Sequence, residues 1–262
     1  MVDSHDHALQ YRSLTVLKAV TPPIIADAVR AAIRRARRPR RREVPHQILP
    51  DQQLYRPHFS PWEGSPEFEG VIAAVAPHSI VSRDRMWVLY TLAQQARHLP
   101  GSFWECGVYK GGTALLLASV AASISRKQLH LFDTFTGIPA ADTKHDYYAT
   151  GIYSDTSLES VKQVVGHDDH TCYHVGTIPE TFQALDNERI AIAHIDVVTY
   201  QSVYDCCCFI YPRLSSGGFI VFDDYGFITC PGARAAVDQF FADKPERPLV
   251  LATAQAVVIK LA

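Results

Sequence analysis

The segment Trp104-Glu105-Cys106-Gly107-Val108-Tyr109-Lys110-Gly111-Gly112-Thr113 lies between a short apolar stretch and a helical pattern. The apolar stretch, 102–108, predicts a buried strand, and the glycine pair opens a helix that continues to about residue 125. Glycines at such a turn let the backbone approach a ligand, and the following helix N-terminus favours an anionic group. The spacing G-x-x-x-G-G matches neither the G-x-G-x-x-G of dinucleotide-binding folds nor a P-loop. The segment therefore predicts a ligand site, with a purely structural tight turn as the alternative.

Two acidic residues indicate the kind of ligand. Glu105 would repel a pyrophosphate, but it suits a ligand with an amino group beside a carboxylate, such as the methionine end of S-adenosyl-L-methionine. Asp133 ends the second predicted strand, where an acid can accept hydrogen bonds from the ribose hydroxyls of NAD or S-adenosylmethionine. The alternative for Asp133 is a helix cap or a turn.

Strands and helices alternate along the chain after this turn. Apolar strands without polar alternation predict a parallel sheet covered on both faces, which is the α/β class, with ligands at the carboxyl ends of the strands. Residues 101–262 are expected to form this core, and 1–100 an N-terminal helical and loop elaboration that acts as a cap and possible oligomer contact. We expect strands at 102–108, 129–135, 172–175, 190–197 and 219–224, helices at 25–38, 68–76, 83–97, 111–125, 200–214 and 231–242, and a closing hairpin at 249–252 and 256–261.

Composition and charge exclude several classes of protein. The 262 residues are 47% hydrophobic and 20% charged, which is typical of a globular chain, and no apolar run is long enough to cross a bilayer. The N-terminus lacks the pattern of a signal peptide, so we expect a soluble, cytoplasmic protein with no membrane partner. The six cysteines contain no C-x-x-C pair, which argues against a zinc ribbon or a thioredoxin-like site.

A basic run lies in an otherwise acidic chain. Residues 30–42 include eight arginines, while the rest of the chain has 17 basic and 27 acidic residues. No aromatic residue interleaves the arginines, so a solvated helix end and linker is favoured over a nucleic-acid contact.

Three aspartates end two of the predicted strands. Asp196 ends the fourth, and Asp223 and Asp224 end the fifth. If these strands are neighbours, three carboxylates meet at one edge of the sheet, where their mutual repulsion is costly. A hard divalent cation removes the repulsion, and oxygen-only ligands indicate Mg²⁺, with Mn²⁺ or Ca²⁺ as alternatives. The other explanation is that these aspartates cap a helix or pair with Arg234.

With these motifs assembled, 102–241 resembles the macrocin O-methyltransferase family. Its members are S-adenosylmethionine- and Mg²⁺-dependent enzymes that methylate sugar hydroxyls of antibiotics, including macrolides and aminocoumarins. The resemblance covers a little over half of the chain. The motifs that carry it are the quoted turn, FDTFTGIP at 132–139, IDV at 195–197, YPRL at 211–214 with the glycines at 217–218, and FDDYG at 222–226 with CPGAR at 230–234.

The resemblance implies a Rossmann-like class I methyltransferase fold, with a mostly parallel seven-stranded sheet and helices on both faces. It implies O-methylation of a hydroxyl on a sugar or similar vicinal diol of an antibiotic-type natural product, by a protein that forms a homodimer. The implied cofactor contacts are Glu105, Gly107, Tyr109, Gly111, Gly112, Thr113, Asp133 and Phe135, and the implied ligands of Mg²⁺ or Mn²⁺ are Asp196, Asp223 and Asp224.

One residue departs from the family pattern. The family usually reads Asp-x-Asp after the fourth strand, and the second acid has been proposed as the general base; here that position is Val198. Valine cannot accept a proton, so either another group accepts it, or the metal suffices, or activity is impaired. The candidates for another base lie in the loop 142–153, notably His145 and Asp146. Tyr225 and Arg234 are expected to line the substrate pocket.

Two other functions stay open. A catalytically weak or inactive homologue that binds cofactor and metal would explain Val198. An NAD-dependent oxidoreductase is a further alternative, which the glycine spacing disfavours.

Overall fold

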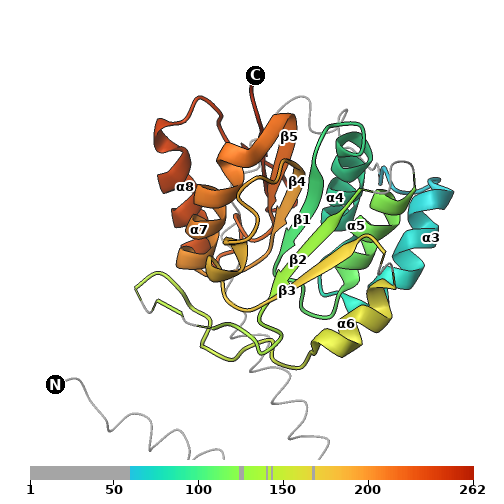
Figure 1. Ribbon diagram of the computed structural model, residues 1–262, viewed down its shortest axis with the longest axis horizontal. Coiled ribbons are helices and arrows are strands. Elements are labelled where there is room, and N and C mark those ends of the chain that lie inside the picture. Colours follow the sequence, from blue (N-terminus) through green and yellow to red (C-terminus); the bar gives the residue numbers. More distant parts are fainter. Residues whose placement is uncertain (1–59, 124–126, 140, 143, 167–168) are drawn as a thin grey trace, which may run out of the picture. The chain divides into compact units, whose positions relative to one another are not determined.

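A mixed sheet of seven strands, in the order β3-β2-β1-β4-β5-β7-β6, forms the centre of the unit Ser60–Ala262 (Figure 1). The computed structural model describes residues 60–123, 127–139, 141–142, 144–166 and 169–262, and Ser60–Ala262 form one compact unit. The first five strands are parallel, and β7 is antiparallel to β5 and β6. The strands are β1 (Ser102–Cys106), β2 (Leu129–Asp133), β3 (Thr171–Val175), β4 (Ile190–Ile195), β5 (Leu214–Phe222), β6 (Leu249–Val250) and β7 (Ala256–Ile259).

Helices cover both faces of the sheet (Figure 1). On one face α3, α4, α5 and α6 form a core with the sheet, and on the other face α7 and α8 form a second core. Helix α5 is apolar on nearly every side because it packs between the sheet and the other helices of its face. The helices are α3 (Pro66–Val75), α4 (Arg83–Ala96), α5 (Gly112–Ala122), α6 (Leu158–Val165), α7 (Tyr200–Ile210) and α8 (Pro231–Phe240).

The strand order reverses between β1 and β4, which lie side by side in the middle of the sheet. In parallel α/β sheets the crevice at this point is where ligands bind. Successive side chains of a strand point to opposite faces, so Phe103 joins the α4–α5 core and Trp104 the α7–α8 core. By the same alternation Glu105 and His194, which are paired in register, lie on the α4–α5 side.

Most elements lie where the sequence predicted them, and the predicted fold class is confirmed. Helix α6 was not predicted, although Ser157 and Ser160 form a capping box at its start. Strand β5 begins five residues earlier than expected, at Leu214, because residues 215–218 (Ser-Ser-Gly-Gly), which have the composition of a turn, are an irregular part of the strand. The predicted helix 25–38 and the arginine run lie outside the described residues.

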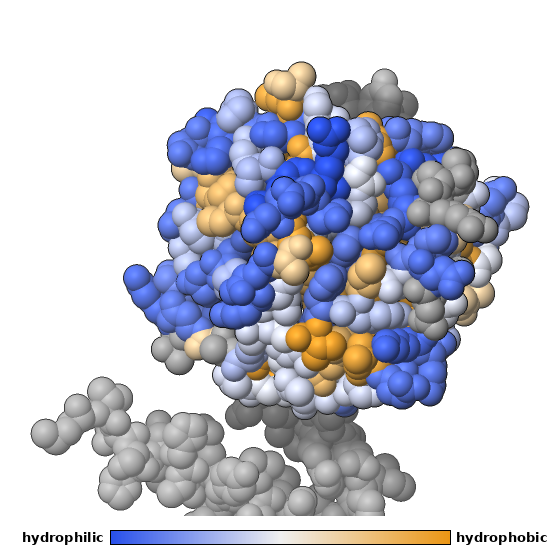
Figure 2. All heavy atoms as spheres, viewed as in Figure 1, coloured by the Kyte–Doolittle hydropathy of each residue, from blue (hydrophilic) through white to orange (hydrophobic). Residues whose placement is uncertain are grey.

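The molecular surface seen in Figure 2 is mainly hydrophilic, with apolar side chains in several separate patches. Such a distribution is ordinary for a globular protein. Among the helices of the described residues, none has both the length and the apolar character that crossing a membrane requires.

Candidate functional site

A cavity of about 250 Å³ opens at the carboxyl ends of the parallel strands. Its wall comes from the segments that follow β1 to β5, including the long loop after β2, and from the residues just before α4. A side chain at Gly107 would collide with the backbone carbonyl of Asp196, so this glycine lets the segments after β1 and β4 touch. The predicted site residues that line the cavity are Gly107, Tyr109, Gly112, Thr113, Asp133, Asp196 and Asp224.

Asp133 holds together the two loops on the β1–β2 side of the cavity. Its Oδ2 accepts hydrogen bonds from the backbone N–H groups of Val108 (2.7 Å) and Tyr109 (2.9 Å), and its Oδ1 accepts one from Phe135 (2.8 Å). Tyr109 and Phe135 have left-handed backbones, with φ of 51° and 54°, a conformation that costs free energy for non-glycine residues. The three hydrogen bonds offset this cost and fix the shape of the cavity wall.

Glu105 lies beneath the glycine turn and does not line the cavity. Its side chain is fully buried, and its Oε1 is 2.8 Å from Nδ1 of His194. Burial raises the pKa of Glu105, while hydrogen bonds with His194 and Thr113 partly oppose the rise. The structure thus gives this carboxylate a buried partner on β4. Gly111 and Phe135, two other predicted cofactor contacts, also lie outside the cavity wall.

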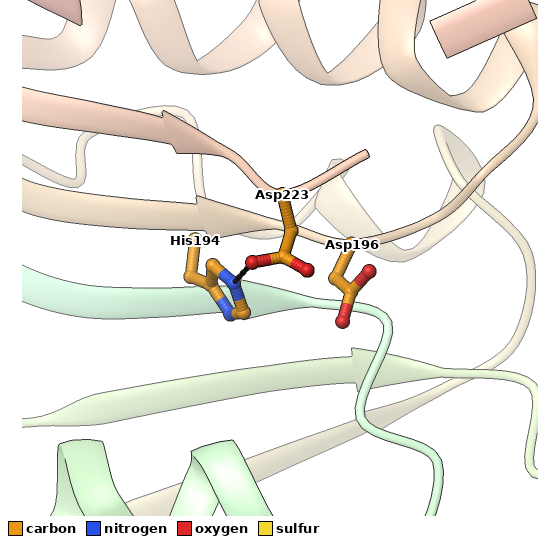
Figure 3. A group of neighbouring side chains, drawn as sticks. All are labelled: His194, Asp196 and Asp223. Carbon is orange, nitrogen blue, oxygen red and sulfur yellow. Dashed lines mark ion pairs between the residues drawn. The ribbon is translucent and has the colours of Figure 1, made fainter. Parts of the chain in front are cut away.

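The carboxylate of Asp223 is fully buried and has three partners, of which Figure 3 shows His194. Oδ1 accepts a hydrogen bond from Nε2 of Gln255 (2.8 Å) and is 3.4 Å from Nε2 of His194, and Oδ2 is paired with Nη1 of Arg85 on α4. Burial alone would raise the pKa of Asp223, but His194, Arg85 and Gln255 outweigh it and lower the pKa.

His194 connects Asp223 with Glu105 within the buried layer. Burial alone would lower its pKa, but hydrogen bonds and charges of Asp223 and Glu105 hold the pKa well above its ordinary value. The structure makes His194 the centre of a buried row of three titratable side chains.

Asp196 and Asp224 differ from Asp223 because both line the cavity. Burial and the charges of Asp223 and Asp224 raise the pKa of Asp196 well above its ordinary value. Burial and the charge of Asp223 likewise raise the pKa of Asp224, against the effect of its hydrogen bond with Asp196. The raised pKa values show that nearby positive groups do not fully compensate the two carboxylates that face the cavity. Such a pair suits a divalent cation that prefers oxygen ligands. The predicted meeting of the three aspartates is therefore observed, but they are not equivalent.

Val198 lines the cavity in a strained conformation. Its φ is 61°, and the N–H of Thr199 donates a 2.6 Å hydrogen bond to the carbonyl of Val197, closing a tight turn around it. A left-handed backbone is a marked outlier for a β-branched residue. At this position the structure presents an apolar side chain to the cavity.

The two candidate bases in the loop do not line the cavity. Oδ1 of Asp146 accepts a hydrogen bond from the backbone N–H of Tyr200 (2.8 Å), which starts α7, a helix with no side-chain cap of its own. His145 stacks on Tyr200, with ring centroids 4.4 Å apart, and its Nδ1 is 2.7 Å from Asp142 Oδ2. Both side chains hold the loop on α7. Asp146 supplies an acceptor that the N-terminus of the helix needs, and His145 stacks on Tyr200. This geometry does not support a catalytic role for either.

Tyr225 and Arg234, the predicted substrate contacts, also lie away from the cavity wall. The hydroxyl of Tyr225 donates to Oδ1 of Asp238 (2.7 Å), and Nε of Arg234 is 3.3 Å from Oδ2 of the same residue. The two side chains share one carboxylate on α8, which explains their positions by packing. A substrate role for them has no support in this geometry.

Arg85 is the main site residue that the sequence did not indicate. It comes from α4, 138 positions before its partner Asp223, and no local motif marks it. His194 had a weak signal, since it lies two positions before Asp196 and so belongs to the same face of β4.

When the chain is compared with models of known protein families, it matches the model of one family. The family model described as "Macrocin-O-methyltransferase (TylF)" matches residues 62–257. Demethyldecarbamoylnovobiocin O-methyltransferase of Streptomyces niveus is 27% identical over 158 residues, which are 55% of this chain and 60% of that protein. Mycinamicin III 3''-O-methyltransferase of Micromonospora griseorubida is 26% identical, over 62% of this chain and 70% of that protein. The match thus covers less than two thirds of the length of the first of these relatives.

Solved structures show the same fold. The O-methyltransferase NovP superposes with a TM-score of 0.62 at 21% identity, over 71% of this chain and 83% of that chain. The calicheamicin methyltransferase CalS11 superposes with a TM-score of 0.60 at 19% identity, over 77% of this chain and 94% of that chain.

Proposed function

Because this chain belongs to the macrocin O-methyltransferase family, we propose that it transfers a methyl group from S-adenosylmethionine to a hydroxyl of a small-molecule acceptor. The observation that carries the proposal is one cavity with two different walls. The glycine turn and Asp133 form one wall, and the carboxylates Asp196 and Asp224 lie on the other. A donor and an acceptor bound in such a cavity meet between these walls, and holding two reactants together lowers the barrier.

The wall beside β1 and β2 fits the methyl donor. The N-terminus of α5 lies at this wall, where its free N–H groups favour a carboxylate. Asp133 has an oxygen, Oδ1, with one hydrogen bond from the protein, and a carboxylate oxygen can accept more than one. This oxygen is suited to a ribose hydroxyl. S-adenosylmethionine supplies the transferable methyl group when bound.

The carboxylate wall fits a divalent cation and an acceptor with two neighbouring oxygens. Asp196 and Asp224 would hold Mg²⁺ or Mn²⁺, and such an ion supplies Lewis-acid stabilisation of an ionising hydroxyl. The acceptor that we propose is a sugar or similar vicinal diol of a natural product. The names of the relatives from Streptomyces niveus and Micromonospora griseorubida, O-methyltransferases of antibiotic compounds, support this class.

A second candidate function follows from Val198. Without the acid at this position, the protein would bind cofactor and metal but methylate slowly or not at all. The intact Asp133, Asp196 and Asp224 in the cavity favour the active enzyme. We further propose that the protein works in the cytoplasm and forms a homodimer through residues 1–100.

The test of this function uses purified protein, isotope-labelled S-adenosylmethionine and a panel of acceptors. The panel pairs each vicinal diol with its mono-deoxy analogue, and each reaction is run with and without EDTA. We expect labelled product from a diol, little from the deoxy analogue and loss of product in EDTA. Cofactor binding by calorimetry with no product from any acceptor would support the second candidate. Product that is indifferent to EDTA would remove the metal from the scheme.

A further inference from the structure

The segment 144–157 is attached to both sides of the cavity. At one end, Oδ1 of Asp146 accepts a hydrogen bond from the backbone N–H of Tyr200, which starts α7 just after the carboxylate wall. At the other end, Oδ1 of Asp155 accepts a 2.9 Å hydrogen bond from the hydroxyl of Tyr109, which belongs to the glycine turn. The segment therefore spans the cavity from the carboxylate wall to the wall that fits the methyl donor.

Two tyrosines between these attachments reach the cavity. Tyr148 and Tyr153 both line it, whereas the neighbouring Tyr147 does not and is 76% exposed. The ring of Tyr153 lies edge-on to the ring of Tyr109, with centroids 5.3 Å apart. On its other side, the centroid of the Tyr148 ring is 5.8 Å away. Three cavity-lining rings thus form a continuous aromatic row.

Tyr153 has a strained backbone and a polar environment. Its φ is 66°, in the left-handed region, which costs free energy for a bulky residue and persists only where surrounding contacts fix it. Burial, a hydrogen bond with Tyr148 and the charges of Asp224 and Cys230 all raise the pKa of Tyr153. Its hydroxyl therefore keeps its proton near pH 7, which makes it a hydrogen-bond donor beside the carboxylate wall and not a base.

We propose that Tyr148 and Tyr153 bind the acceptor, with their rings against a sugar ring and their hydroxyls on oxygens beyond the diol that faces the carboxylates. This inference rests on the proposed function and narrows its acceptor from any vicinal diol to a pyranose. A pyranose has C–H groups that pack on aromatic rings, and further oxygens that match the polar ends of the tyrosines.

A catechol, which is also a vicinal diol, fits these two side chains less well. Both of its oxygens would be used at the carboxylate wall, so none is left for the phenol groups. The mutual hydrogen bond of Tyr148 and Tyr153 uses only one of their two O–H groups. The other would lose its water without gaining a partner, which costs free energy.

Replacing each tyrosine by phenylalanine removes the hydroxyl and keeps the ring. We expect the wild type to bind methyl α-L-rhamnopyranoside more tightly than catechol. Tyr148→Phe and Tyr153→Phe should each weaken the binding of the pyranoside about threefold to tenfold, the effect of one lost hydrogen bond. Their affinity for catechol should stay within about twofold of the wild-type value. Tyr147→Phe is the matched control, because this tyrosine lies in the same segment but outside the cavity wall; it should leave both affinities unchanged.

The experiment uses the full chain with Mg²⁺ and saturating S-adenosylhomocysteine, the demethylated cofactor. The affinity for each ligand is measured by saturation-transfer NMR and by calorimetry. Circular dichroism reports on folding, and the affinity for S-adenosylhomocysteine reports separately on the cofactor site; both should be the same in every variant. The comparison with catechol is needed because a purely structural role of the hydroxyls would change both affinities together.

Three results would overturn the inference. The first is that Tyr148→Phe and Tyr153→Phe bind the pyranoside as tightly as the wild type does. The second is an equal loss of affinity for the pyranoside and for catechol. The third is a wild type that binds S-adenosylhomocysteine but not the pyranoside. In each case, binding of S-adenosylhomocysteine leaves the proposed function standing, whereas a wild type that binds none of these ligands would overturn both.

Discussion

Val198 combines two unfavourable features at one position of the cavity wall. A β-branched side chain in the left-handed region costs about 1–2 kcal/mol, and an apolar side chain there offers no group that accepts a proton. Asparagine and aspartate both tolerate this backbone conformation better than valine. Comparing these two substitutions therefore separates the effect of backbone strain from the effect of the missing proton acceptor.

We predict that Val198→Asn and Val198→Asp each raise the free energy of unfolding by about 1 kcal/mol, because both relieve backbone strain. Only Val198→Asp should raise kcat, by at least about tenfold, since it restores a proton acceptor. Urea denaturation and steady-state kinetics on the three proteins provide the measurements. An equal gain in kcat from asparagine would attribute the effect to backbone strain and not to the base.

Asp146 has a structural explanation that makes a distinct prediction. Its carboxylate accepts from the first N–H of α7, so Asp146→Ala should lower the free energy of unfolding by about 1 kcal/mol, as the loss of a helix cap does. Its kcat should stay within about tenfold of the wild type, whereas loss of a general base costs about 10²–10⁴. His145→Ala, in the same loop, is the matched variant. A drop of a hundredfold or more in kcat for either, with stability unchanged, would restore it as a catalytic candidate.

Strands β2 and β3 carry a pair of stacked histidines outside the cavity. Nδ1 of His130 is 3.0 Å from Nε2 of His174, and the ring centroids are 5.2 Å apart. Burial lowers the pKa of each to about 4, and for His174 the charge of His130 adds to the effect. Both rings are therefore neutral in the folded protein near pH 7.

This pair should make the fold sensitive to acid. Between pH 6.5 and pH 4 the unfolded chain binds protons on these histidines that the folded chain does not, so stability falls as the pH falls. For one such histidine the loss amounts to about 3 kcal/mol between pH 7 and pH 4. The double variant His130→Phe/His174→Phe should show a shallower decline in urea denaturation across this range. If the free energy of unfolding of the double variant falls as steeply with pH as that of the wild type, these two histidines are not the cause of the acid sensitivity. His98→Gln, at an exposed histidine, serves as the control.

The elements show where sequence patterns succeed and fail. Short, mostly apolar runs predicted β1, β2 and β4, because a strand buried on both faces is rich in apolar residues. The start of β5 was missed because Ser215-Ser216-Gly217-Gly218 has the composition of a turn. In the structure Gly217 has a φ of 77°, and the pairing with β4 shifts register here. A strand with such an irregularity looks like a turn in the sequence.

At the scale of the whole molecule, the sequence predicted which residues reach the site but not which side chains they meet. The turn after β1 and the three aspartates were found because strand ends of a parallel sheet share one edge. Arg85 was not found, since only the tertiary packing of α4 brings it to Asp223. Asp146, Tyr225 and Arg234 were assigned to the site by their proximity to motifs, and the structure gives their polar groups other partners.

The central claim is that a hydroxyl is methylated in the cavity between Asp133 and the pair Asp196 and Asp224. The most direct measurement is the transfer of an isotope-labelled methyl group from S-adenosylmethionine to a vicinal-diol acceptor, comparing the wild type with Asp196→Asn and Asp224→Asn. We predict a labelled ether with the wild type and a rate at least about a hundredfold lower with each variant. Labelled product formed at the wild-type rate by both variants would contradict the account.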